Sequence, residues 1–414
     1  LLIGAGRSAT SLINYLKLHA SNHDWWITIG DYSVSLAEEK LKDFSRGNAI
    51  SFDVHNQEQV QKEIQQVDLV ISMLPAHLHF LVAQQCVNFS KSLLTASYVS
   101  SEIKMLDKQA KEKGILILME MGLDPGIDHM SAKKEIDAIH EQGGVINTFK
   151  SFTGGLVAPE SDTNPWNYKF TWNPRNVVLA GQGTVKFLRN NNYKYIPYHN
   201  LFNRLDEIFV EGYGIFEGYP NRDSLKYRDL YDLQKIPTIL RGTLRRKGFC
   251  RAWNIFVQLG ITDDSYSLES MENVTYRDFI NAYLPYNENL SVEEKISKQF
   301  QIPLDDDIIF KLKWLGLFSD QKIALTGHVS PAKILQNILE KKWGLGDNDR
   351  DMIVMQHGFE YEINEDKYDL KSSMVVLGDD AKMTSMAKTV GLPLGIAAKL
   401  YLTDQLNLVG VQIP

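Results

Sequence analysis

Cysteine is almost missing from this chain, whose 414 residues include only Cys86 and Cys250. The two cysteines are far apart and fit no metal-ligand spacing, so the sequence predicts neither a disulfide scaffold nor a metal site. So low a cysteine content suits a reducing compartment, and we therefore expect a cytoplasmic protein.

Long apolar runs and an excess of positive charge are missing too. No apolar run approaches the roughly 18 residues of a membrane span, so we expect no membrane contact. The formal net charge of -7 argues against general nucleic-acid binding, and any positive charge that a site needs must be local. A hydrophobic content of 44% is that of a globular protein, and the length predicts two or three domains.

The first residues carry a dinucleotide-binding fingerprint. Leu1-Leu2-Ile3 is a short apolar strand, Gly4-x-Gly6-x-x-Ala9 follows it, and a helical pattern continues through Leu18. The glycines permit a tight turn and close approach of a pyrophosphate, while the helix N-terminus supplies N–H donors. A second strand over 25–29 leads to Asp31, where an acid accepts hydrogen bonds from the adenosine ribose. The alternative is a coincidental strand with a solvent-facing aspartate.

Strands and helices then alternate up to residue 118. We expect helices over 33–44, 57–66, 79–89 and 101–113, and strands over 49–54, 68–73, 92–95 and 115–118. Alternation of this kind predicts an α/β domain with a doubly wound, mostly parallel sheet of the Rossmann type.

The segment from Met119 to His129 follows the last of these strands and contains a Gly-Leu-Asp-Pro-Gly turn. Gly122 and Gly126 flank Asp124-Pro125, and helical spacing resumes over 127–141. The turn places backbone N–H groups and the Asp124 carboxylate at the carboxyl edge of the sheet, where open α/β folds bind ligands. The alternative is an ordinary turn in which Asp124 only caps the helix.

Beyond about residue 143 the pattern changes. We expect strands over 145–154, 208–215 and 238–246, a hinge or bulge at Gly154-Gly155, and a polar loop over 158–173. Residues 252–345 are mainly helical, 351–356 and 372–377 form a pair of strands, and a last helix over 380–400 is interrupted at Gly391-Leu392-Pro393. We expect this helix to return and pack on the first domain, which would make both domains discontinuous.

These patterns predict three domains. Residues 1–125 with about 380–414 form the dinucleotide-binding domain, and about 126–250 with 346–379 form an α+β substrate-binding domain with a mixed sheet. Residues of about 251–345 form a small helical subdomain.

Arginines in the second half fit the binding of an anion. Arg222 lies in a polar turn, and Arg241, Thr243 and Arg245 share one face of a strand. A guanidinium group donates two parallel hydrogen bonds to a carboxylate, so these arginines predict an anionic substrate. The alternative is a set of exposed or ion-paired arginines without a ligand.

His77 and His129 are candidates for proton transfer, because an unperturbed imidazole titrates near neutral pH. Lone histidines beside helices are more often packed or solvated, and this alternative stays open. No Ser-His-Asp or Cys-His arrangement accompanies them.

Several long motifs carry a family resemblance. The first half contributes Thr95-Ala-Ser97-Tyr98-Val-Ser and Glu120-Met-Gly-Leu-Asp-Pro-Gly-Ile-Asp-His129. The second half contributes Gly154-Gly-Leu-Val-Ala-Pro-Glu160, Tyr168-Lys-Phe-Thr-Trp172, Tyr219-Pro-Asn-Arg-Asp-Ser224, Arg241-Gly-Thr-Leu-Arg245 and Asp351-Met-Ile-Val-Met-Gln-His357. Together they resemble the saccharopine dehydrogenase (saccharopine reductase) family, in particular its L-glutamate-forming branch, over almost the whole chain.

The resemblance implies an NAD(P)-dependent oxidoreductase of lysine metabolism that acts on CH–NH donors. The family oxidises the secondary amine of saccharopine to an imine, whose hydrolysis releases L-glutamate and 2-aminoadipate 6-semialdehyde, or it runs the reverse reaction. The resemblance also implies that the substrate domain forms a homodimer.

Residues for both ligands follow from the resemblance by matching position. Those assigned to the substrate are Ser97, Tyr98, Asp124, Trp172, Arg222, Thr243, Leu244 and Arg245, with Asp124 as the catalytic candidate. Those assigned to the cofactor are Gly4, Ala5, Gly6, Arg7, Ala9, Asp31, Asp53, Met73, Thr95, Ala96, Leu123 and Pro125. Saccharopine carries three carboxylates, which Arg222 and Arg245 would bind.

The sequence departs from the resembled family at two positions. Fungal relatives commonly carry an arginine that faces a 2′-phosphate where this chain has Asp31, so Asp31 favours NAD whereas the family favours NADP. Arg246 stands where relatives carry a tyrosine, and it adds a charge near the site.

Two other functions stay open. A related reductase of another amine–carboxylate condensation product, such as carboxynorspermidine, would favour acids over Arg222 and Arg245. A nucleotide-binding sensor without catalysis would keep the glycine fingerprint but would not need the arginine-bearing segments.

Overall fold

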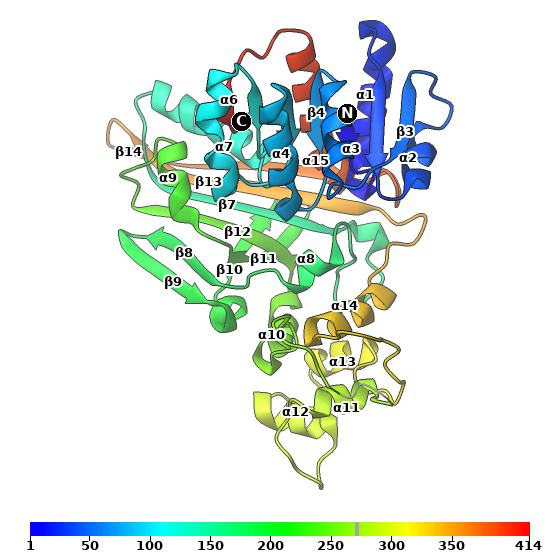
Figure 1. The fold of residues 1–414 in the computed structure, drawn as a ribbon. Helices are drawn as coiled ribbons and strands as arrows, with labels where there is room; N and C mark the ends of the chain where they lie inside the picture. The colour runs from blue at the N-terminus through cyan, green and yellow to red at the C-terminus, as the bar shows by residue number, and fades with distance from the viewer. Residues whose placement is uncertain (270–272) are drawn as a thin grey trace. The chain divides into compact units, whose positions relative to one another are not determined.

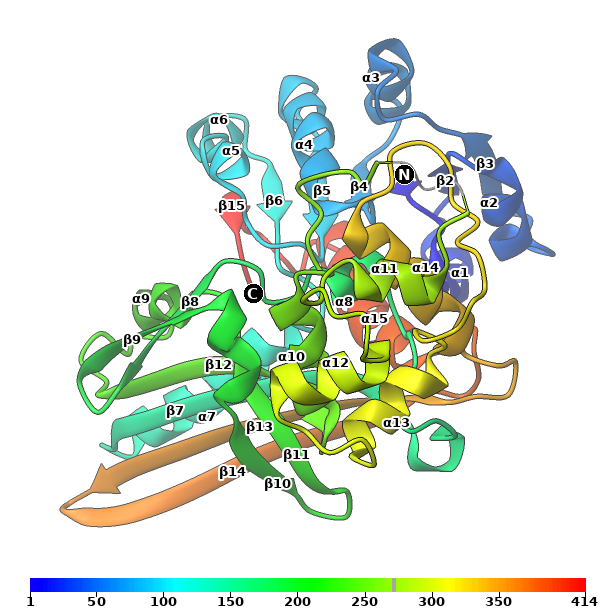
Figure 2. The same cartoon turned by 90° about the horizontal axis from the view of Figure 1, so that it is seen from below.

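A computed structural model describes residues 1–269 and 273–414 of the chain. The chain divides into two compact units (Figures 1 and 2). The first unit comprises Leu1–Asp137 and Val376–Pro414, and the second comprises Ala138–Val375. The second unit is therefore inserted into the sequence of the first. The division of the second unit into a substrate domain and a helical subdomain stays a prediction.

A seven-stranded parallel sheet forms the centre of the first unit. Its strands are β1 (Leu2–Ile3), β2 (Ile27–Asp31), β3 (Gly47–Ser51), β4 (Leu69–Ser72), β5 (Ser92–Thr95), β6 (Leu116–Leu118) and β15 (Gly410–Gln412). They lie in the order β15-β6-β5-β4-β1-β2-β3. The chain order reverses between β1 and β4, which is the point at which doubly wound sheets bind ligands. The predicted Rossmann-type sheet is confirmed, whereas β15 was not predicted.

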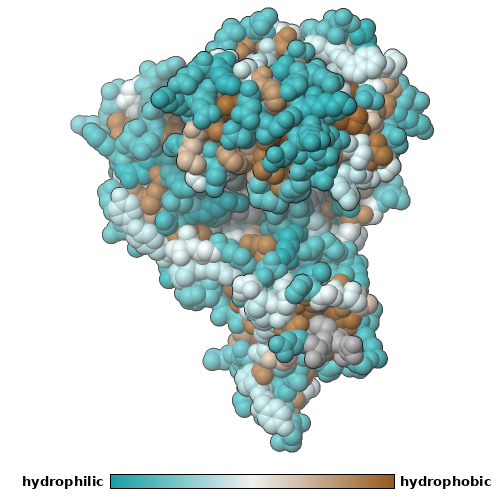
Figure 3. Space-filling view, in the orientation of Figure 1, coloured by the Kyte–Doolittle hydropathy of each residue, from teal (hydrophilic) through white to brown (hydrophobic). Residues whose placement is uncertain are grey.

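Helices cover both faces of this sheet. They are α1 (Thr10–His23), α2 (Val34–Leu41), α3 (Gln57–Gln65), α4 (His79–Asn88), α5 (Ser101–Lys104), α6 (Asp107–Glu112) and α15 (Ser385–Leu402). Successive strand residues point to opposite faces, so Leu2 and Ile3 enter different cores. Leu2 belongs to the core with Leu12 and Leu394, whereas Ile3 belongs to the core with Val82. Figure 3 shows mainly hydrophilic side chains on the visible outer surface of these helices.

The last helix is continuous, and the predicted interruption at residues 391–393 is wrong. α15 runs from Ser385 to Leu402 with Pro393 inside it. Its glycines serve packing, because a Cβ at Gly391 would lie 2.8 Å from Leu12 N and one at Gly395 would lie 2.7 Å from the Tyr15 ring. Close approach to α1 therefore explains these glycines, and the expected return of this helix to the first domain is confirmed.

A mixed sheet forms the centre of the second unit, as predicted. Its strands are β7 (Val145–Val157), β8 (Thr184–Arg189), β9 (Asn192–Pro197), β10 (Asp206–Val210), β11 (Gly214–Pro220), β12 (Thr238–Arg246), β13 (Asp351–Ile363) and β14 (Asp366–Leu377). The order is β10-β11-β12-β7-β13-β14, and β8 pairs with both β12 and β9. β12 and β7 are parallel, whereas the pairs β10–β11, β11–β12, β12–β8, β7–β13 and β8–β9 are antiparallel. The hairpin of β13 and β14 is longer than predicted (Figure 2).

Gly154 and Gly155 lie in an unbroken strand, so the predicted hinge or bulge is wrong. They pair with Val354 and Ile353 without a shift of register. A Cβ at Gly154 would lie 2.8 Å from both Cβ and O of Leu244 on the neighbouring strand. Close contact between β7 and β12 therefore requires the glycine.

In the part of the chain that the structure describes, eight further α-helices lie between residues 127 and 342, and the first of them runs from the first unit into the second. They are α7 (Ile127–Glu141), α8 (Pro174–Val178), α9 (Tyr227–Leu230), α10 (Phe249–Leu259), α11 (Tyr276–Asn281), α12 (Val292–Phe300), α13 (Asp307–Trp314) and α14 (Pro331–Lys342). Trp166, Trp253 and Trp343 pack in an aromatic core, with ring centroids 5.3 Å apart for Trp166 and Trp343. Within the described ranges, no helix is long and apolar enough to cross a membrane.

Candidate functional site

The carboxyl ends of β1, β4, β5 and β6 bring predicted cofactor residues together in the first unit. Met73 donates its N–H to Ile3 O at 2.8 Å, so the ends of β4 and β1 are adjacent. Met121 donates its N–H to Thr95 O at 3.1 Å, which joins the ends of β6 and β5. The fingerprint and the segment after β6 therefore belong to one edge of one sheet.

The glycine loop after β1 has the geometry that a pyrophosphate needs. Gly4 has φ +102°, and a Cβ there would lie 3.1 Å from Met73 O. A Cβ at Gly6 would meet no atom within 4 Å, so the loop is open at this residue. The 3-10 turn η1 (Arg7–Ala9) follows and leads into α1, with Arg7 exposed and Ala9 buried. These residues fit a dinucleotide.

Asp31 binds the glycine loop from the end of β2. Its Oδ2 accepts the N–H of Ala5 at 2.7 Å, and its Oδ1 accepts the N–H of Ser33 at 2.9 Å. The half-buried carboxylate is thus fixed at the loop, so a purely solvent-facing aspartate is excluded. The N–H of Ala5 is occupied, and phosphate oxygens must use other donors of this loop.

Asp53 lies apart from the other predicted cofactor residues. It follows β3, the outer strand of the sheet, and its side chain is exposed. Its Oδ1 accepts the N–H of His55 at 2.9 Å. A ligand bound at the glycine loop after β1 would have to extend past the end of β2 to reach Asp53.

The turn after β6 depends on two glycines and on Asp128. Gly122 donates its N–H to Pro125 O at 2.9 Å, and a Cβ at Gly126 would overlap the backbone of Gly122. The Asp124–Pro125 peptide bond is cis. The carboxylate that accepts the N–H of Gly126, at 2.7 Å, belongs to Asp128. This hydrogen bond places the Asp128 carboxylate at the start of α7.

Asp124 is held instead by the segment after β5. The Tyr98 hydroxyl donates to Asp124 Oδ1 at 2.7 Å, and both side chains are half-buried. Glu120 donates its N–H to Ser97 O at 3.0 Å, which fixes the two segments side by side. Three residues assigned to the substrate, Ser97, Tyr98 and Asp124, thus lie together.

Glu120 and His129 form a buried pair that stabilises this arrangement. His129 Nε2 lies 2.8 Å from Glu120 Oε2, and Glu120 Oε1 accepts the N–H of Val99 at 3.0 Å. Glu120 adopts φ +58°, an uncommon conformation for a residue with a side chain. His129 is thus packed, as the alternative interpretation had it.

The sequence interpretation missed His79. His77 is exposed on the 3-10 turn η2 (Ala76–Leu78), whereas His79 is buried and its Nε2 lies 2.7 Å from Ser97 Oγ. Both histidines flank Leu78, and only the orientation of the turn into α4 distinguishes them. No local sequence signal was available.

Arg245 of the second unit is buried in an aromatic cage. Its Cζ lies 5.1 Å from the ring of Tyr168, 5.8 Å from Tyr219 and 5.4 Å from Phe249, and 4% of the residue is exposed. Nη1 donates to Leu244 O at 2.8 Å, while Nε has no partner.

No neighbouring group neutralises the Arg245 charge. Burial raises the pKa of the Tyr168 and Tyr219 phenols, and burial raises the pKa of the Cys250 thiol well above its usual value, so all three stay protonated. Within residues 1–269 and 273–414, no carboxylate lies at ion-pair distance from Arg245. An isolated buried charge costs several kcal/mol, so burial of the Arg245 guanidinium is unfavourable to the extent that the surrounding rings and the Leu244 carbonyl do not compensate it.

The remaining substrate candidates lie near β12 in different environments. Arg222 is exposed with φ +48°, and its O accepts the N–H of Lys186 at 2.9 Å. Asn221 Nδ2 donates to Thr243 Oγ1 at 3.0 Å, so the Arg222 turn lies against the strand. Leu244 is fully buried, and only its backbone is available to a ligand. Trp172 is half-buried, four residues after Tyr168 of the cage.

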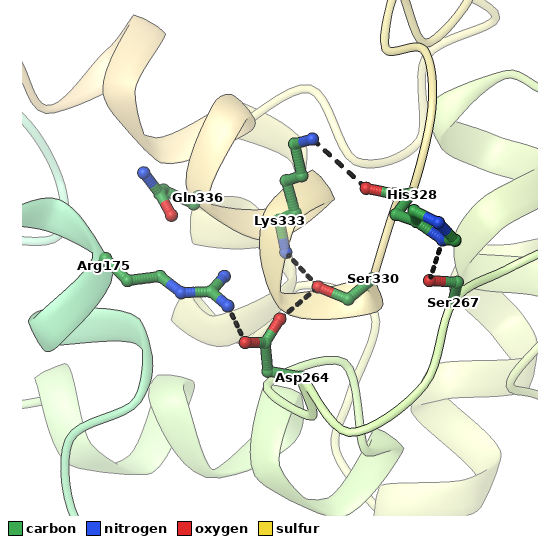
Figure 4. Close-up of a pocket in the computed structure, with 7 residues that line it drawn as sticks. All are labelled: Arg175, Asp264, Ser267, His328, Ser330, Lys333 and Gln336. Carbon is green, nitrogen blue, oxygen red and sulfur yellow. Dashed lines mark hydrogen bonds and ion pairs between the residues drawn. The ribbon is translucent and has the colours of Figure 1, made fainter. Parts of the chain in front are cut away.

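A pocket of about 480 Å³ lies elsewhere in the second unit (Figure 4). Asp264 accepts hydrogen bonds from Arg175 and Ser330, and Lys333 Nζ donates to His328 O at 3.2 Å (Figure 4). None of the predicted site residues lines it. Its charged groups already have partners, so its size alone does not mark it as the substrate site.

Comparison with known proteins gives matches along the whole chain. Residues 1–118 match the saccharopine dehydrogenase NADP binding domain, and residues 122–414 match the saccharopine dehydrogenase C-terminal domain. The chain is 33% identical to a Schizosaccharomyces pombe protein named saccharopine dehydrogenase (NADP(+), L-glutamate-forming), over 100% of this chain and 93% of that protein.

Two further relatives extend this finding. The structure of apo saccharopine dehydrogenase (L-Glu forming) from Saccharomyces cerevisiae matches with a TM-score of 0.89 and 32% identity, covering 100% of this chain and 93% of that one. An Arabidopsis thaliana alpha-aminoadipic semialdehyde synthase is 34% identical, and this chain spans 42% of its length.

Proposed function

The chain belongs to the saccharopine dehydrogenase family, and we propose that it interconverts saccharopine with L-glutamate and 2-aminoadipate 6-semialdehyde. The reaction is an NAD(P)-dependent oxidation of a secondary amine to an imine, followed by hydrolysis, or the reverse. It places the protein in lysine metabolism.

The observation that carries this proposal is the buried guanidinium of Arg245. A cation without an acidic partner is unfavourable inside a protein unless a ligand brings the missing negative charge. Saccharopine carries three carboxylates, and a carboxylate matches the planar fork of an arginine. Arg222, in the turn beside β12, supplies a second cation for the same substrate. A substrate rich in amines would not need this pair.

Asp124 and Tyr98 support the proposed chemistry from the first unit. When bound, the dinucleotide supplies the hydride acceptor or donor. As hydride leaves carbon, positive charge develops on the neighbouring nitrogen, and a fixed carboxylate stabilises that charge. The Tyr98 hydroxyl holds the Asp124 carboxylate at 2.7 Å. We infer that the same carboxylate accepts the proton that the amine loses.

Residues of the first unit would hold the dinucleotide. Gly4 through Arg7 would contact the pyrophosphate, because Gly6 leaves that side of the loop open. Asp31, Met73 and Thr95 lie at the carboxyl ends of β2, β4 and β5, with β1 between β2 and β4. We propose that the cofactor is NAD or NADP, that the protein acts in the cytoplasm, and that it forms a homodimer. Sedimentation equilibrium tests the last point.

An absorbance assay tests the function directly. We expect saccharopine to reduce NAD or NADP, measured at the reduced-nicotinamide band, with L-glutamate as a product. Carboxynorspermidine, which has fewer carboxylates, should give a specificity constant at least about 100-fold lower, since the loss of one charge-assisted pair costs about 3 kcal/mol. Binding of cofactor and saccharopine without turnover would support the sensor alternative, and turnover of carboxynorspermidine alone would support the related reductase.

A further inference from the structure

A buried row of hydroxyl groups and one imidazole lies behind the ends of β4 and β5. Ser72 Oγ lies 2.9 Å from His79 Nδ1, and His79 Nε2 lies 2.7 Å from Ser97 Oγ. Thr95 Oγ1 is 3.3 Å from the same Nε2. Ser72, His79 and Thr95 are buried, whereas Ser97 is half-buried. Ser97 is thus the end of the row that a ligand can reach.

His79 is neutral in this environment. Burial, together with the charge of nearby His77, lowers the pKa of His79 to about 4. A neutral imidazole has one ring nitrogen that donates a hydrogen bond and one that accepts. The tautomer therefore decides which way the hydroxyl protons on either side point.

Ser72 determines the tautomer from the inner end of the row. Its side chain is fully buried, and within the described part of the chain its hydroxyl has one hydrogen-bond partner, His79 Nδ1. If Nδ1 carried the proton, the Ser72 hydroxyl proton would lack an acceptor in a site without water access, which is unfavourable. Ser72 therefore donates to Nδ1, and the ring proton is on Nε2.

The Nε2 proton in turn orients Ser97. Both Ser97 Oγ and Thr95 Oγ1 lie within reach of Nε2, and Thr95 Oγ1 also accepts the N–H of Ser97 at 3.4 Å. With Nε2 as the donor, the Ser97 oxygen accepts and its own proton points away from the ring. With the other tautomer, that proton would be used on Nε2, and Ser97 would have none for a ligand. A carboxylate only accepts hydrogen bonds.

We propose that His79 is a positioning residue that turns the Ser97 hydroxyl proton toward the substrate, so that Ser97 donates a hydrogen bond to a substrate carboxylate. This inference rests on the proposed function for the identity of the ligand. The tautomer of His79 follows from the buried row alone. Ser72, His79 and Thr95 act through Ser97 and do not contact the substrate.

Nitrogen-15 NMR of histidine-labelled protein tests the tautomer without reference to activity. The ring resonances of His79 are identified by their loss in His79→Gln. At neutral pH we expect a protonated Nε2 and a bare Nδ1, and Ser72→Ala should weaken this preference because Nδ1 loses its donor. A protonated Nδ1 in the wild type would overturn the inference, even if saccharopine turns over normally.

A double-mutant cycle tests the action through Ser97. His79→Met, which cannot donate, should raise KM for saccharopine about tenfold and leave KM for the dinucleotide unchanged. In a Ser97→Ala background the same change should have less than about a twofold effect. His79→Gln, which can donate from a similar position, should restore most of the affinity.

The outcomes distinguish this inference from the proposed function. Equal effects of His79→Met in both backgrounds would show a role independent of Ser97 and would overturn the inference. If His79→Met does not fold, the cycle is run with Ser72→Ala. For this variant we expect KM for saccharopine to rise by a smaller factor than in His79→Met. Absence of saccharopine turnover in the wild type would contradict the proposed function, whereas the NMR result would still decide the tautomer.

Discussion

Arg245→Met separates a ligand-binding arginine from one that supports the fold. Methionine has a similar length and no charge, so it fills the cage of Tyr168, Tyr219 and Phe249 without a guanidinium group. We expect the variant to fold and to lose most of its activity toward saccharopine.

The two magnitudes follow from the cage. A charge-assisted, bidentate pair with a carboxylate contributes about 2–4 kcal/mol, so kcat/KM should fall about 30- to 1,000-fold. For stability, three rings at about 1–2 kcal/mol each and one carbonyl hydrogen bond offset a desolvation cost of several kcal/mol. These contributions nearly cancel, and the free energy of unfolding should change by less than about 2 kcal/mol.

Steady-state kinetics and thermal unfolding with and without saccharopine measure both quantities. Saturating saccharopine at about 100 times its Kd should stabilise the wild type by about 2.7 kcal/mol and leave Arg245→Met nearly unchanged. Arg246→Met is the matched control, because Arg246 is the next residue and bonds Tyr213 O instead. Activity of Arg245→Met within threefold of wild type, or a loss of more than about 4 kcal/mol of stability, would refute the reasoning.

Four other variants test the remaining assignments. Arg222→Ala should lower kcat/KM about 30- to 1,000-fold with partial rescue by Lys, and a change within threefold would contradict a ligand role. Asp124→Asn should lower turnover at least about tenfold with little change in Tm, whereas loss of folding would favour the turn-only role. Asp31 presents a carboxylate at the glycine loop, which would repel the 2′-phosphate of NADP. The wild type should therefore prefer NAD over NADP about tenfold or more in kcat/KM, although a relative is named for NADP. An NADP preference that Asp31→Ala leaves unchanged would contradict this prediction. The pKa of His79 falls from 6.5 to about 4 on folding, so the contribution of its neutral form to stability is complete above pH 6.5. This contribution, about 3 kcal/mol, is lost as the pH falls toward 4. Denaturant unfolding of His79→Gln should therefore depend less on pH than that of the wild type, and an unchanged pH dependence would count against the assignment.

Local patterns were sufficient for six of the seven strands of the first unit's sheet, β1 to β6. The short strand, the glycines and the helix of the fingerprint lie next to one another in the sequence, and their spacing determines the turn that they form. The α7 helix was predicted over 127–141 as it is found, since glycines fix its start. In these places the neighbours in sequence are also the neighbours in space.

Three strands show where local patterns were insufficient or were overlooked. β15 has three residues, and its Gly410 pairs with Leu116 of β6, far away in the sequence. So short a strand carries no signal of its own. The hairpin of β8 and β9 did carry one, because Asn190 and Asn191 both adopt positive φ, 50° and 60°, as in tight hairpin turns. Asparagine tolerates this conformation, and the Asn-Asn pair was available in the sequence.

The site was predictable only as a set of segments. The motifs pointed to Tyr98 and Asp124, but their 2.7 Å hydrogen bond depends on two loops brought together by the sheet. The burial of Arg245 depends on Tyr168 and Tyr219, which come from other parts of the chain. The choice of His79 over His77 depends on the orientation of one turn. Such features arise from tertiary packing, which periodicity does not encode.

The insertion of the second unit into the first has a consequence for synthesis on the ribosome. β6 is complete at residue 118, but its partner β15 begins at Gly410 and α15, which packs on α1, begins at Ser385. At about 5–20 residues per second, the nascent first unit exposes the free edge of β6 and the apolar face of α1 for about 15–60 s. Throughout that interval the emerging chain is a substrate for chaperones, and the sheet that would receive the dinucleotide is completed only when β15 has left the ribosome.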